Sequence, residues 1–401
     1  MKTLRDQRQQ EFAEKWLERH HGILYLCPRF GKIKTSITIM EALSNPRTLI
    51  IYPIETIRKS WEEDLVKWSY TAPQQVSYST TASLWKLVGQ ELDYEFIIVD
   101  EIHLLSPANI EELKAIMAQL KIPVLGLSGT ISDRTEAVLN SQLGLYIVGN
   151  YDIETGIRER VITDYKITVI MTYLDNTDKY IVPSKKYPNF KCTELSRYVY
   201  LSDKMEQVKQ EYLMRKARWE RSFEACKTDL ERKELLKTKP DLPDDYGLLP
   251  IQRMQIFKKS RGKAAVTLKL IERARKNNQR ALIFCGTTEI ADSLGIPVFH
   301  SKAKDLDLRD TFCSGVGQFL ATVDMFEAGV TVKPIDVAII NSFDSNPENL
   351  AQRISRLTGY EYDNPEKLAK IYIVCTKTVE EQWLEKALEF FDLSKVNYIT
   401  A

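Results

Sequence analysis

The stretch ILYLCPRFGKIKTSITIMEAL, residues 23–43, decides the fold class of this chain. A hydrophobic run leads into Gly31-Lys32 and then into an amphipathic helical pattern, which is the layout of a phosphate-binding loop. Gly31 allows close backbone approach and Lys32 supplies charge, but only these two positions match G-x-x-x-x-G-K-[ST]. Ile33 stands where a Ser or Thr belongs. Taken alone, the match favours a chance Gly-Lys in a loop.

The alternation of buried strand and amphipathic helix continues along the chain. Short β-branched runs lie at 49–53, 96–101 and 124–130, and the segment 110–120 between two of them has helical spacing. The same pattern returns in later runs, at 281–286, 297–301, 318–323, 337–342 and 370–375. This rhythm is typical of doubly wound sheets, and 401 residues are too many for one ordinary core. We therefore predict an α/β protein with two parallel-sheet domains.

The middle of the chain has a different character. A predicted strand at 164–174 precedes a long, charged helical segment at 205–237, and a second helical segment at 251–274 leads back to the sheet pattern. The predicted boundaries are 1–165 for the first domain, 166–262 for a linker strand with a helical insert, and 263–401 for the second domain.

The charged insert has two interpretations. It is either a solvated helical hairpin that spaces two lobes or a basic element that contacts nucleic acid. The basic side chains that would make such contacts are Arg215, Lys216, Arg218 and Arg221. Because acidic residues are interspersed among them, the sequence leaves both interpretations open.

Composition excludes several classes of protein. The chain is 44% hydrophobic and 28% charged, and its formal net charge of +1 says little about partners. Its six cysteines form no C-x-x-C pair and have no His spaced to complete a zinc site, so we expect reduced thiols. The N-terminal segment is polar, and no apolar run approaches the ~18 residues of a membrane span. We expect a cytoplasmic protein.

A pair of acids provides the second chemical feature. In IIVDEIH, residues 97–103, a buried strand delivers Asp100 and Glu101 at its carboxyl end, where open α/β sheets bind ligands. Asp100 is placed to hold Mg²⁺ through water, and Glu101 to activate an attacking water as general base, so we assign both to a magnesium site. Two adjacent acids can also be a mere turn. Their position after the phosphate loop, however, is the order that a nucleotide-driven motor requires.

In this order the segments resemble the motifs of superfamily 2 DEAD/DEAH-box-type helicases. The first-domain matches are LIIYPIETIRKSW (49–61) for motif Ia, TTASL (80–84) for motif Ib, DEIH (100–103) for the acidic box and LSGT (127–130) for motif III. The second-domain matches are ALIFCGTT (281–288) for motif IV, HSK (300–302), FLATVDMFEAGVTV (319–332) for motif V and NLAQRISRLTG (349–359) for motif VI. Segments 156–170 and 378–388 resemble type III restriction and XPB-like helicases and phage UvsW-like helicases, respectively.

The resemblance implies two RecA-like lobes in tandem, with ATP and Mg²⁺ bound between them. It gives catalytic roles to Lys32, Asp100, Glu101, Gln352, Arg353 and Arg356, the two arginines reaching across the cleft. It gives ATP contacts to Gln10 (with Gln7 as a rival), Arg29, Phe30, Gly31, Lys32, Ile33, Lys34 and Gly329. The alternative for the two glutamines is that they are surface residues of a helix. It gives coupling roles to His103, Ser128 and Thr130, and nucleic-acid contacts to Pro53, Arg58, Thr81, Gly286, Thr287, His300, Ser301, Lys302 and Thr322.

Two positions depart from the pattern of the family. Ile33 cannot coordinate Mg²⁺, and Thr35 points ~200° away on the helix, although a water could fill the vacant position. Gly359 stands where the last arginine of motif VI belongs, which leaves Arg356. We therefore expect an ATP site that is weakened but not abolished.

The resemblance implies an ATP-dependent helicase or translocase of phage type, acting on nucleic acid in replication, recombination or repair. We expect DNA rather than RNA, contacts mainly to the backbone without sequence specificity, and replication, recombination or nuclease proteins as partners. One alternative is a nucleotide-gated nucleic-acid-binding protein with negligible hydrolysis, which Ile33 and Gly359 favour and Glu101 and Arg356 oppose. Another is the motor subunit of a restriction-like complex, which would need a separate nuclease.

Overall fold

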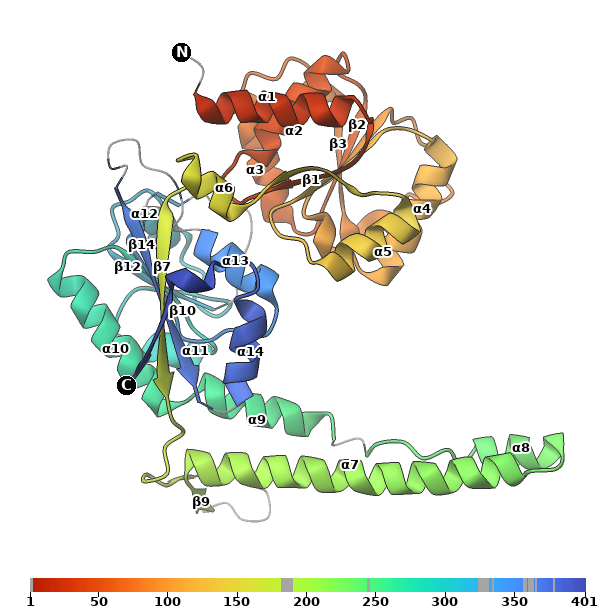
Figure 1. The fold of residues 1–401 in the computed structure, drawn as a ribbon, viewed down its shortest axis with the longest axis vertical. Helices are drawn as coiled ribbons and strands as arrows, with labels where there is room; N and C mark the ends of the chain where they lie inside the picture. Colours follow the sequence, from red (N-terminus) through yellow and green to blue (C-terminus); the bar gives the residue numbers. More distant parts are fainter. Residues whose placement is uncertain are drawn as a thin grey trace.

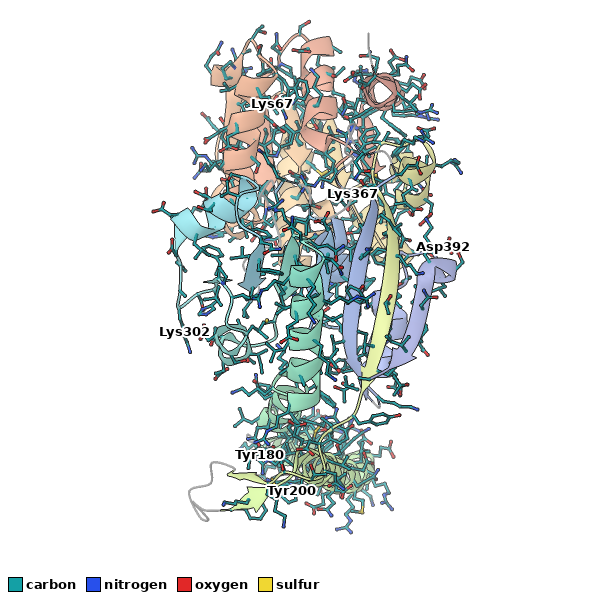
Figure 2. The ribbon with its side chains drawn as sticks, turned by 90° about the vertical axis from the view of Figure 1, so that its left-hand side faces the viewer. Lys67, Tyr180, Tyr200, Lys302, Lys367 and Asp392 are labelled. Carbon is teal, nitrogen blue, oxygen red and sulfur yellow. The ribbon has the colours of Figure 1, made fainter. Side chains whose placement is uncertain are left out.

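The computed structural model describes residues 3–181, 190–243, 246–323, 332–333, 335–355, 359, 364, 366–377 and 379–401. Two sheets whose neighbouring strands are all parallel form two domains in tandem, and a helical arm projects from the second (Figure 1). Figure 2 shows the same molecule from the side, with Lys67 in the first domain and Tyr200 at the base of the arm. The predicted α/β class with two parallel-sheet domains is confirmed.

The first domain is built on a six-stranded sheet of order β3-β2-β4-β5-β1-β6. Its strands are β1 (His21–Leu26), β2 (Thr48–Tyr52), β3 (Val76–Thr80), β4 (Phe96–Val99), β5 (Val124–Ser128) and β6 (Ile147–Tyr151). Its helices are α1 (Leu4–Leu17), α2 (Lys32–Ala42), α3 (Glu55–Lys67), α4 (Pro107–Leu120), α5 (Asp133–Leu143) and α6 (Ile153–Arg158). The central strands β2, β4 and β5 are buried along their whole length because helices cover both faces of a parallel sheet.

The second domain is built on a seven-stranded sheet of order β11-β12-β10-β13-β14-β7-β15. Its strands are β7 (Asp164–Thr172), β10 (Ala281–Phe284), β11 (Val298–Phe299), β12 (Phe319–Thr322), β13 (Val337–Ile340), β14 (Leu368–Thr376) and β15 (Val396–Thr400). Its helices are α10 (Arg261–Lys276), α11 (Thr288–Ser293), α12 (Leu306–Cys313), α13 (Pro347–Ser355) and α14 (Val379–Ala387).

Strand β7 corrects the predicted domain boundaries. The sequence predicts a linker strand after residue 165, but β7 lies inside the second sheet. It pairs with β14 from Asp164↔Leu368 to Thr172↔Thr376, and with β15 on its other side. The second domain therefore begins at β7, and the arm is an insertion within that domain.

The arm consists of α7 (Glu194–Ala225), α8 (Asp229–Leu236) and α9 (Leu248–Lys258), and a two-stranded sheet of β8 (Tyr180–Ile181) and β9 (Lys191–Cys192) precedes it. Its base is held by a small apolar cluster of Leu174, Leu201, Leu249, Ile256 and Phe257. Near its tip, Trp219 stacks on Phe223 and donates a hydrogen bond to the carbonyl of Leu235. The six cysteines all lie among the described residues, and none of them forms a disulfide. Within the described part of the chain, every helix is too short or too polar to span a bilayer.

Candidate nucleotide site and its contacts between domains

The predicted phosphate loop connects the end of β1 to the start of α2. Gly31 caps α2 in a left-handed conformation, with φ at +105°, and a Cβ there would lie 2.3 Å from Gln9 Nε2. The positive φ favours glycine at this position, and a side chain there would displace the Gln9 amide. Phe30 anchors the loop in the core, where its ring lies 4.6 Å from that of Tyr151 and 5.8 Å from that of Phe12. The loop therefore has a fixed shape before any ligand binds.

The glutamine that contacts this loop is Gln9. Its side chain is buried, and Nε2 donates a hydrogen bond of 2.8 Å to the carbonyl of Phe30. The sequence prediction named Gln10, with Gln7 as a rival, but Gln10 is exposed and its amide bonds to Glu14 on the outer face of α1. The missed signal was helical phase: the buried side chains of α1 are Gln9, Phe12, Ala13 and Trp16, one apolar stripe that includes a glutamine.

Three of the charged groups predicted for catalysis, Lys32, Asp100 and Glu101, come together near the carboxyl ends of β1 and β4. Lys32 Nζ lies 2.5 Å from Glu101 Oε1 and 3.7 Å from Asp100 Oδ1. Asp100 is oriented by the indole N–H of Trp61, which donates to Oδ2 at 2.9 Å, and by the amide of Glu101, which donates to Oδ1. The structure thus places one lysine, two carboxylates and the N-terminus of α2 at one point.

Burial and these charges act against each other on the pKa values of the site. Burial lowers the pKa of Lys32, but Glu101 and Asp100 raise it by more, so the pKa lies above its ordinary value. Burial raises the pKa of Asp100, and Lys32 opposes this shift. Lys32 is therefore a cation at neutral pH and keeps the charge that phosphate binding requires.

The residues after Lys32 supply no hydroxyl to the site. The Ile33 side chain packs against the core of the first domain. Lys34 Nζ lies 4.8 Å from the centroid of the Trp68 ring, and its ATP contact stays a prediction. Thr35 is buried and its hydroxyl donates to the carbonyl of Gly31, which agrees with the expectation that it does not replace the missing ligand.

A buried hydrogen-bonded chain leads from the acids to the second domain. His103 Nδ1 lies 2.8 Å from Ser128 Oγ and 3.5 Å from Glu101 Oε2, and its Nε2 lies 3.5 Å from the amide nitrogen of Gln352 on α13. Burial lowers the pKa of His103 to about 4, so the ring is neutral at pH 7. Because Ser128 Oγ donates to the carbonyl of Thr130, it accepts from Nδ1–H of His103, which leaves Nε2 to accept from Gln352.

The neighbouring arginine on α13 does not share this orientation. Arg353 is buried, donates from Nη1 to the carbonyl of Ser342 at 2.7 Å, and lies 5.5 Å from the centroid of the Phe284 ring. Both contacts are within the second domain. Successive helical residues point ~100° apart, so Arg353 does not share the direction of Gln352. The role of Arg353 across the cleft stays a prediction. Arg356 and Gly329 lie outside the described residues.

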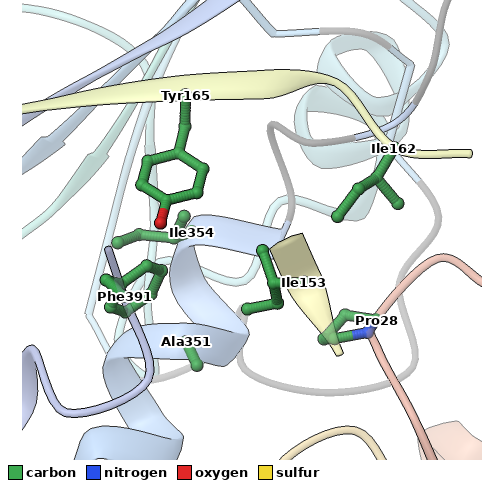
Figure 3. A pocket seen from close by; sticks show the side chains of 7 residues that line it. All are labelled: Pro28, Ile153, Ile162, Tyr165, Ala351, Ile354 and Phe391. Atoms are coloured by element: carbon green, nitrogen blue, oxygen red, sulfur yellow. The ribbon is translucent and has the colours of Figure 1, made fainter. Parts of the chain in front are cut away.

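Two further contacts join the phosphate loop to the second domain and to the hinge, which is the segment 159–163 between α6 and β7. Arg5 on α1 donates from Nη2 to the carbonyls of both Arg29 and Val161. Arg29, a loop residue with φ at 71°, donates to the carbonyl of Val332 in the second domain at 3.3 Å. A small apolar pocket beside these contacts draws on both domains and the hinge (Figure 3). Its lining residues are Pro28, Ile153, Ile162, Tyr165, Ala351, Ile354 and Phe391.

The hinge itself bonds to the end of motif VI. Ile162 forms an isolated antiparallel bridge with Gly359, and the Thr163 hydroxyl donates to the carbonyl of Gly359 at 2.9 Å. A Cβ at Gly359 would meet nothing within 4 Å, so a side chain at this position has room.

The predicted nucleic-acid residues lie at or after the carboxyl ends of β2, β3, β10, β11 and β12. Arg58 is exposed and bonds to Glu62. His300 is buried and its ring bonds to Asp292 and to the amide of Lys302, so it shapes the turn. Ser301 and Lys302 are exposed in that turn. Pro53 and Thr81 follow neighbouring strands of the first sheet, Thr287 caps α11 after Gly286, and Thr322 is buried at the end of β12.

Comparison with known proteins agrees with this architecture. Residues 262–358 match the helicase conserved C-terminal domain. No curated protein sequence was found to match the chain. Among solved structures, S. cerevisiae Dbp5 bound to RNA and ADP BeF3 aligns with a TM-score of 0.55 and 10% identity, over 98% of this chain and 89% of that one.

Two other solved structures align over nearly the whole chain. The Pyrococcus furiosus Hef helicase domain has a TM-score of 0.50 and 16% identity, over 95% of this chain and 98% of that one. The ATP-dependent Type ISP restriction-modification enzyme LlaBIII bound to DNA has a TM-score of 0.55 and 13% identity, over 98% of this chain and 31% of that one. At such identities the similarity shows the fold alone, two tandem RecA-like domains. The finer resemblance to UvsW-like or XPB-like helicases stays a prediction.

Proposed function

We propose that this protein is an ATP-dependent nucleic-acid motor, a helicase or translocase, with its ATP site at Lys32, Asp100 and Glu101. The observation that carries this proposal is the meeting of these three charges at the N-terminus of α2, beside a histidine that contacts the second domain. The fold and the helicase C-terminal domain support it. A role in replication, recombination or repair, and a phage origin, rest on the sequence resemblance alone.

Each residue of the site has a distinct task in this proposal. Lys32 and the amides at the start of α2 bind the β- and γ-phosphates. Because Lys32 and Glu101 form an ion pair of 2.5 Å, the lysine has to leave the carboxylate to bind phosphate. Glu101 can then accept a proton from the attacking water. The pairing keeps the general base occupied until nucleotide binds.

The donor set fits Mg²⁺. The ion usually binds proteins through one or two carboxylates and keeps several waters, and Asp100 and Glu101 supply those carboxylates. When bound, Mg²⁺ neutralises charge on the transferring phosphoryl group. Asp100 is held for this task by Trp61 and by the Glu101 amide.

Communication between the domains runs through His103 and Gln352. Their contact joins the acid-bearing loop to α13, so a movement of Glu101 changes the environment of a side chain on the second domain. Closure of the cleft around ATP and its opening after hydrolysis would then shift the nucleic-acid contacts of one domain relative to the other.

The second candidate function is a nucleotide-gated nucleic-acid-binding protein. One observation favours it: Ile33 packs against the core and the Thr35 hydroxyl donates to the carbonyl of Gly31, so neither residue offers a hydroxyl to Mg²⁺. In the motor, by contrast, a water takes that position. Ile33→Thr separates these readings, because a restored hydroxyl should raise turnover most at low Mg²⁺ in a protein that already hydrolyses ATP. A melting curve controls for the lost packing of Ile33.

The test of the proposed function is ATP turnover with single-stranded, duplex and forked DNA and with RNA in parallel. All four are needed because one structural neighbour is bound to RNA and another to DNA. We expect DNA to stimulate turnover above the level of a Lys32→Ala control. ATP binding without turnover on any nucleic acid would favour the gated binder, and an absence of ATP binding would refute both candidates.

A further inference from the structure

A tryptophan stands out on the surface of the first domain. Trp85 belongs to η2, a 3₁₀ turn (Thr81–Lys86) that follows β3, and its side chain is 62% exposed. The neighbouring Leu84 is fully buried, and Leu87 packs against the same core. These two leucines fix the turn so that Trp85 faces solvent, followed three residues later by the exposed Val88.

The turn that carries this indole is tied down on several sides. Asn109 of α4 donates to the carbonyl of Thr81 at 2.9 Å, and the Thr80 hydroxyl donates to Ser83 Oγ at 3.0 Å. Farther along, the Gln119 amide donates to the carbonyl of Gln90 at 2.7 Å. A rigid segment therefore holds a large apolar ring in water, which forfeits the free energy that burying the ring would release. Such an arrangement is typical of a contact surface.

The position of Trp85 points to the kind of contact. Strands β3, β2 and β4 are neighbours in the sheet, and their carboxyl ends lie at the same edge. The segments that follow β2 and β4 also expose apolar side chains, Ile54 at 44% and Leu104 at 43%. Leu104 directly follows His103 of the candidate site, and Thr81, a predicted nucleic-acid residue, begins the turn of Trp85. The ammonium of Lys86 lies 5.7 Å from the Trp85 ring.

We infer that Trp85 stacks on an unpaired base of a nucleic-acid strand that passes along this edge, with Lys86 facing the adjacent phosphate. The inference rests on the proposed function and adds a contact to bases, where the predicted contacts are to the backbone. An aromatic face beside a cation is the combination that binds single strands, because every base offers a flat face for stacking. Paired bases are covered by their neighbours in a duplex, so the preferred ligand is single-stranded.

The experiment compares a short single-stranded oligonucleotide with an abasic strand of the same length, which has the backbone without the bases. Binding is followed by intrinsic tryptophan fluorescence and by anisotropy of labelled strands, with the whole chain. We expect the base-bearing strand, but not the abasic one, to quench tryptophan emission. Trp85→Leu should abolish the quenching and weaken binding of the base-bearing strand by about 5- to 150-fold, the range for one lost stacking contact.

Two matched measurements make the test specific. Trp85→Phe keeps an aromatic face and should retain most of the affinity. Trp68→Leu removes another partly exposed tryptophan, 37% exposed at the end of α3, and should leave the base-dependent affinity unchanged. If Trp85→Leu binds each strand as tightly as the unchanged protein does, the inference is overturned and the proposed motor function is unaffected. If the unchanged protein binds neither strand, the proposed function fails and the inference falls with it.

Discussion

Gln9 offers the most direct test of how the phosphate loop is held. Its amide donates to the carbonyl of Phe30 at 2.8 Å, and both residues are buried. Gln9→Leu keeps the volume but leaves that carbonyl without its donor, which costs about 1–3 kcal/mol. Gln9→Ala also opens a cavity beside Gly31 and should cost more. Because the loss is local to the loop, we expect weaker ATP binding in addition to lower stability.

The assay measures two quantities in the same variants. Urea unfolding gives the free energy of unfolding, and titration with a fluorescent ATP analogue gives the affinity of the site. The control is Gln10→Leu, which removes only an exposed bond to Glu14 and should change the free energy of unfolding by less than about 0.5 kcal/mol. The reasoning would be refuted if Gln9→Leu matched Gln10→Leu in both measurements. The opposite ranking, with Gln10 critical for ATP binding, would restore the original sequence prediction.

Three further predictions address catalysis, the arm and pH. Lys32→Ala should weaken ATP binding, whereas Glu101→Gln should bind ATP but not turn it over; wild-type turnover in either would contradict the site. Residues 213–239 of the arm hold nine Lys and Arg against five Asp and Glu. Changing Arg215, Lys216 and Arg218 to Ala should therefore lower the salt slope of nucleic-acid binding by roughly one unit per lost phosphate contact. An unchanged slope would make the arm a spacer. The His103 pKa falls from 6.5 to about 4 on folding, so the unfolded chain binds more protons than the folded one between these two pH values. The free energy of unfolding should therefore decrease by up to about 3 kcal/mol as pH falls through this window. Unfolding measured from pH 7 downward should show a shallower loss in His103→Asn, and parallel curves would exclude this role.

The sequence predicted the central strands well because they are buried on both faces. β2, β4 and β5 are short, continuous apolar runs, a pattern typical of strands buried inside a parallel sheet. The edge strands β6 and β15 were missed, since IVGNY and VNYIT are partly exposed and contain polar residues. The place of β7 could not be read from its own residues. Its partner β14 is distant in sequence, and only the folded sheet determines which strands meet.

In the candidate site, the sequence identified chemical groups better than it identified the directions of side chains. Lys32, Asp100 and Glu101 were chosen by residue type and order, and His103 and Ser128 by the resemblance to helicase motifs. The structure brings all five together. What the sequence did not determine is which way neighbouring helical side chains point. A shift of one residue rotates a side chain by ~100°, which separates Gln9 from Gln10 and the cross-domain contact of Gln352 from the inward contacts of Arg353. Only the apolar stripe of α1 could have shown from the sequence that Gln9, and not Gln10, faces the loop.

The place of β7 between β14 and β15 also sets the order in which the domains are completed during synthesis. All six strands of the first sheet precede β7 in the chain, so that domain has its full set of pairing partners early. β7 leaves the ribosome long before β14 and β15, and the whole arm is translated in the interval. During that interval β7 has both edges unpaired, and exposed strand edges are prone to wrong pairing with other chains. The nascent protein thus passes through a stage in which the first domain has all of its strands, while β7 stays unpaired until β14 and β15 have been synthesised.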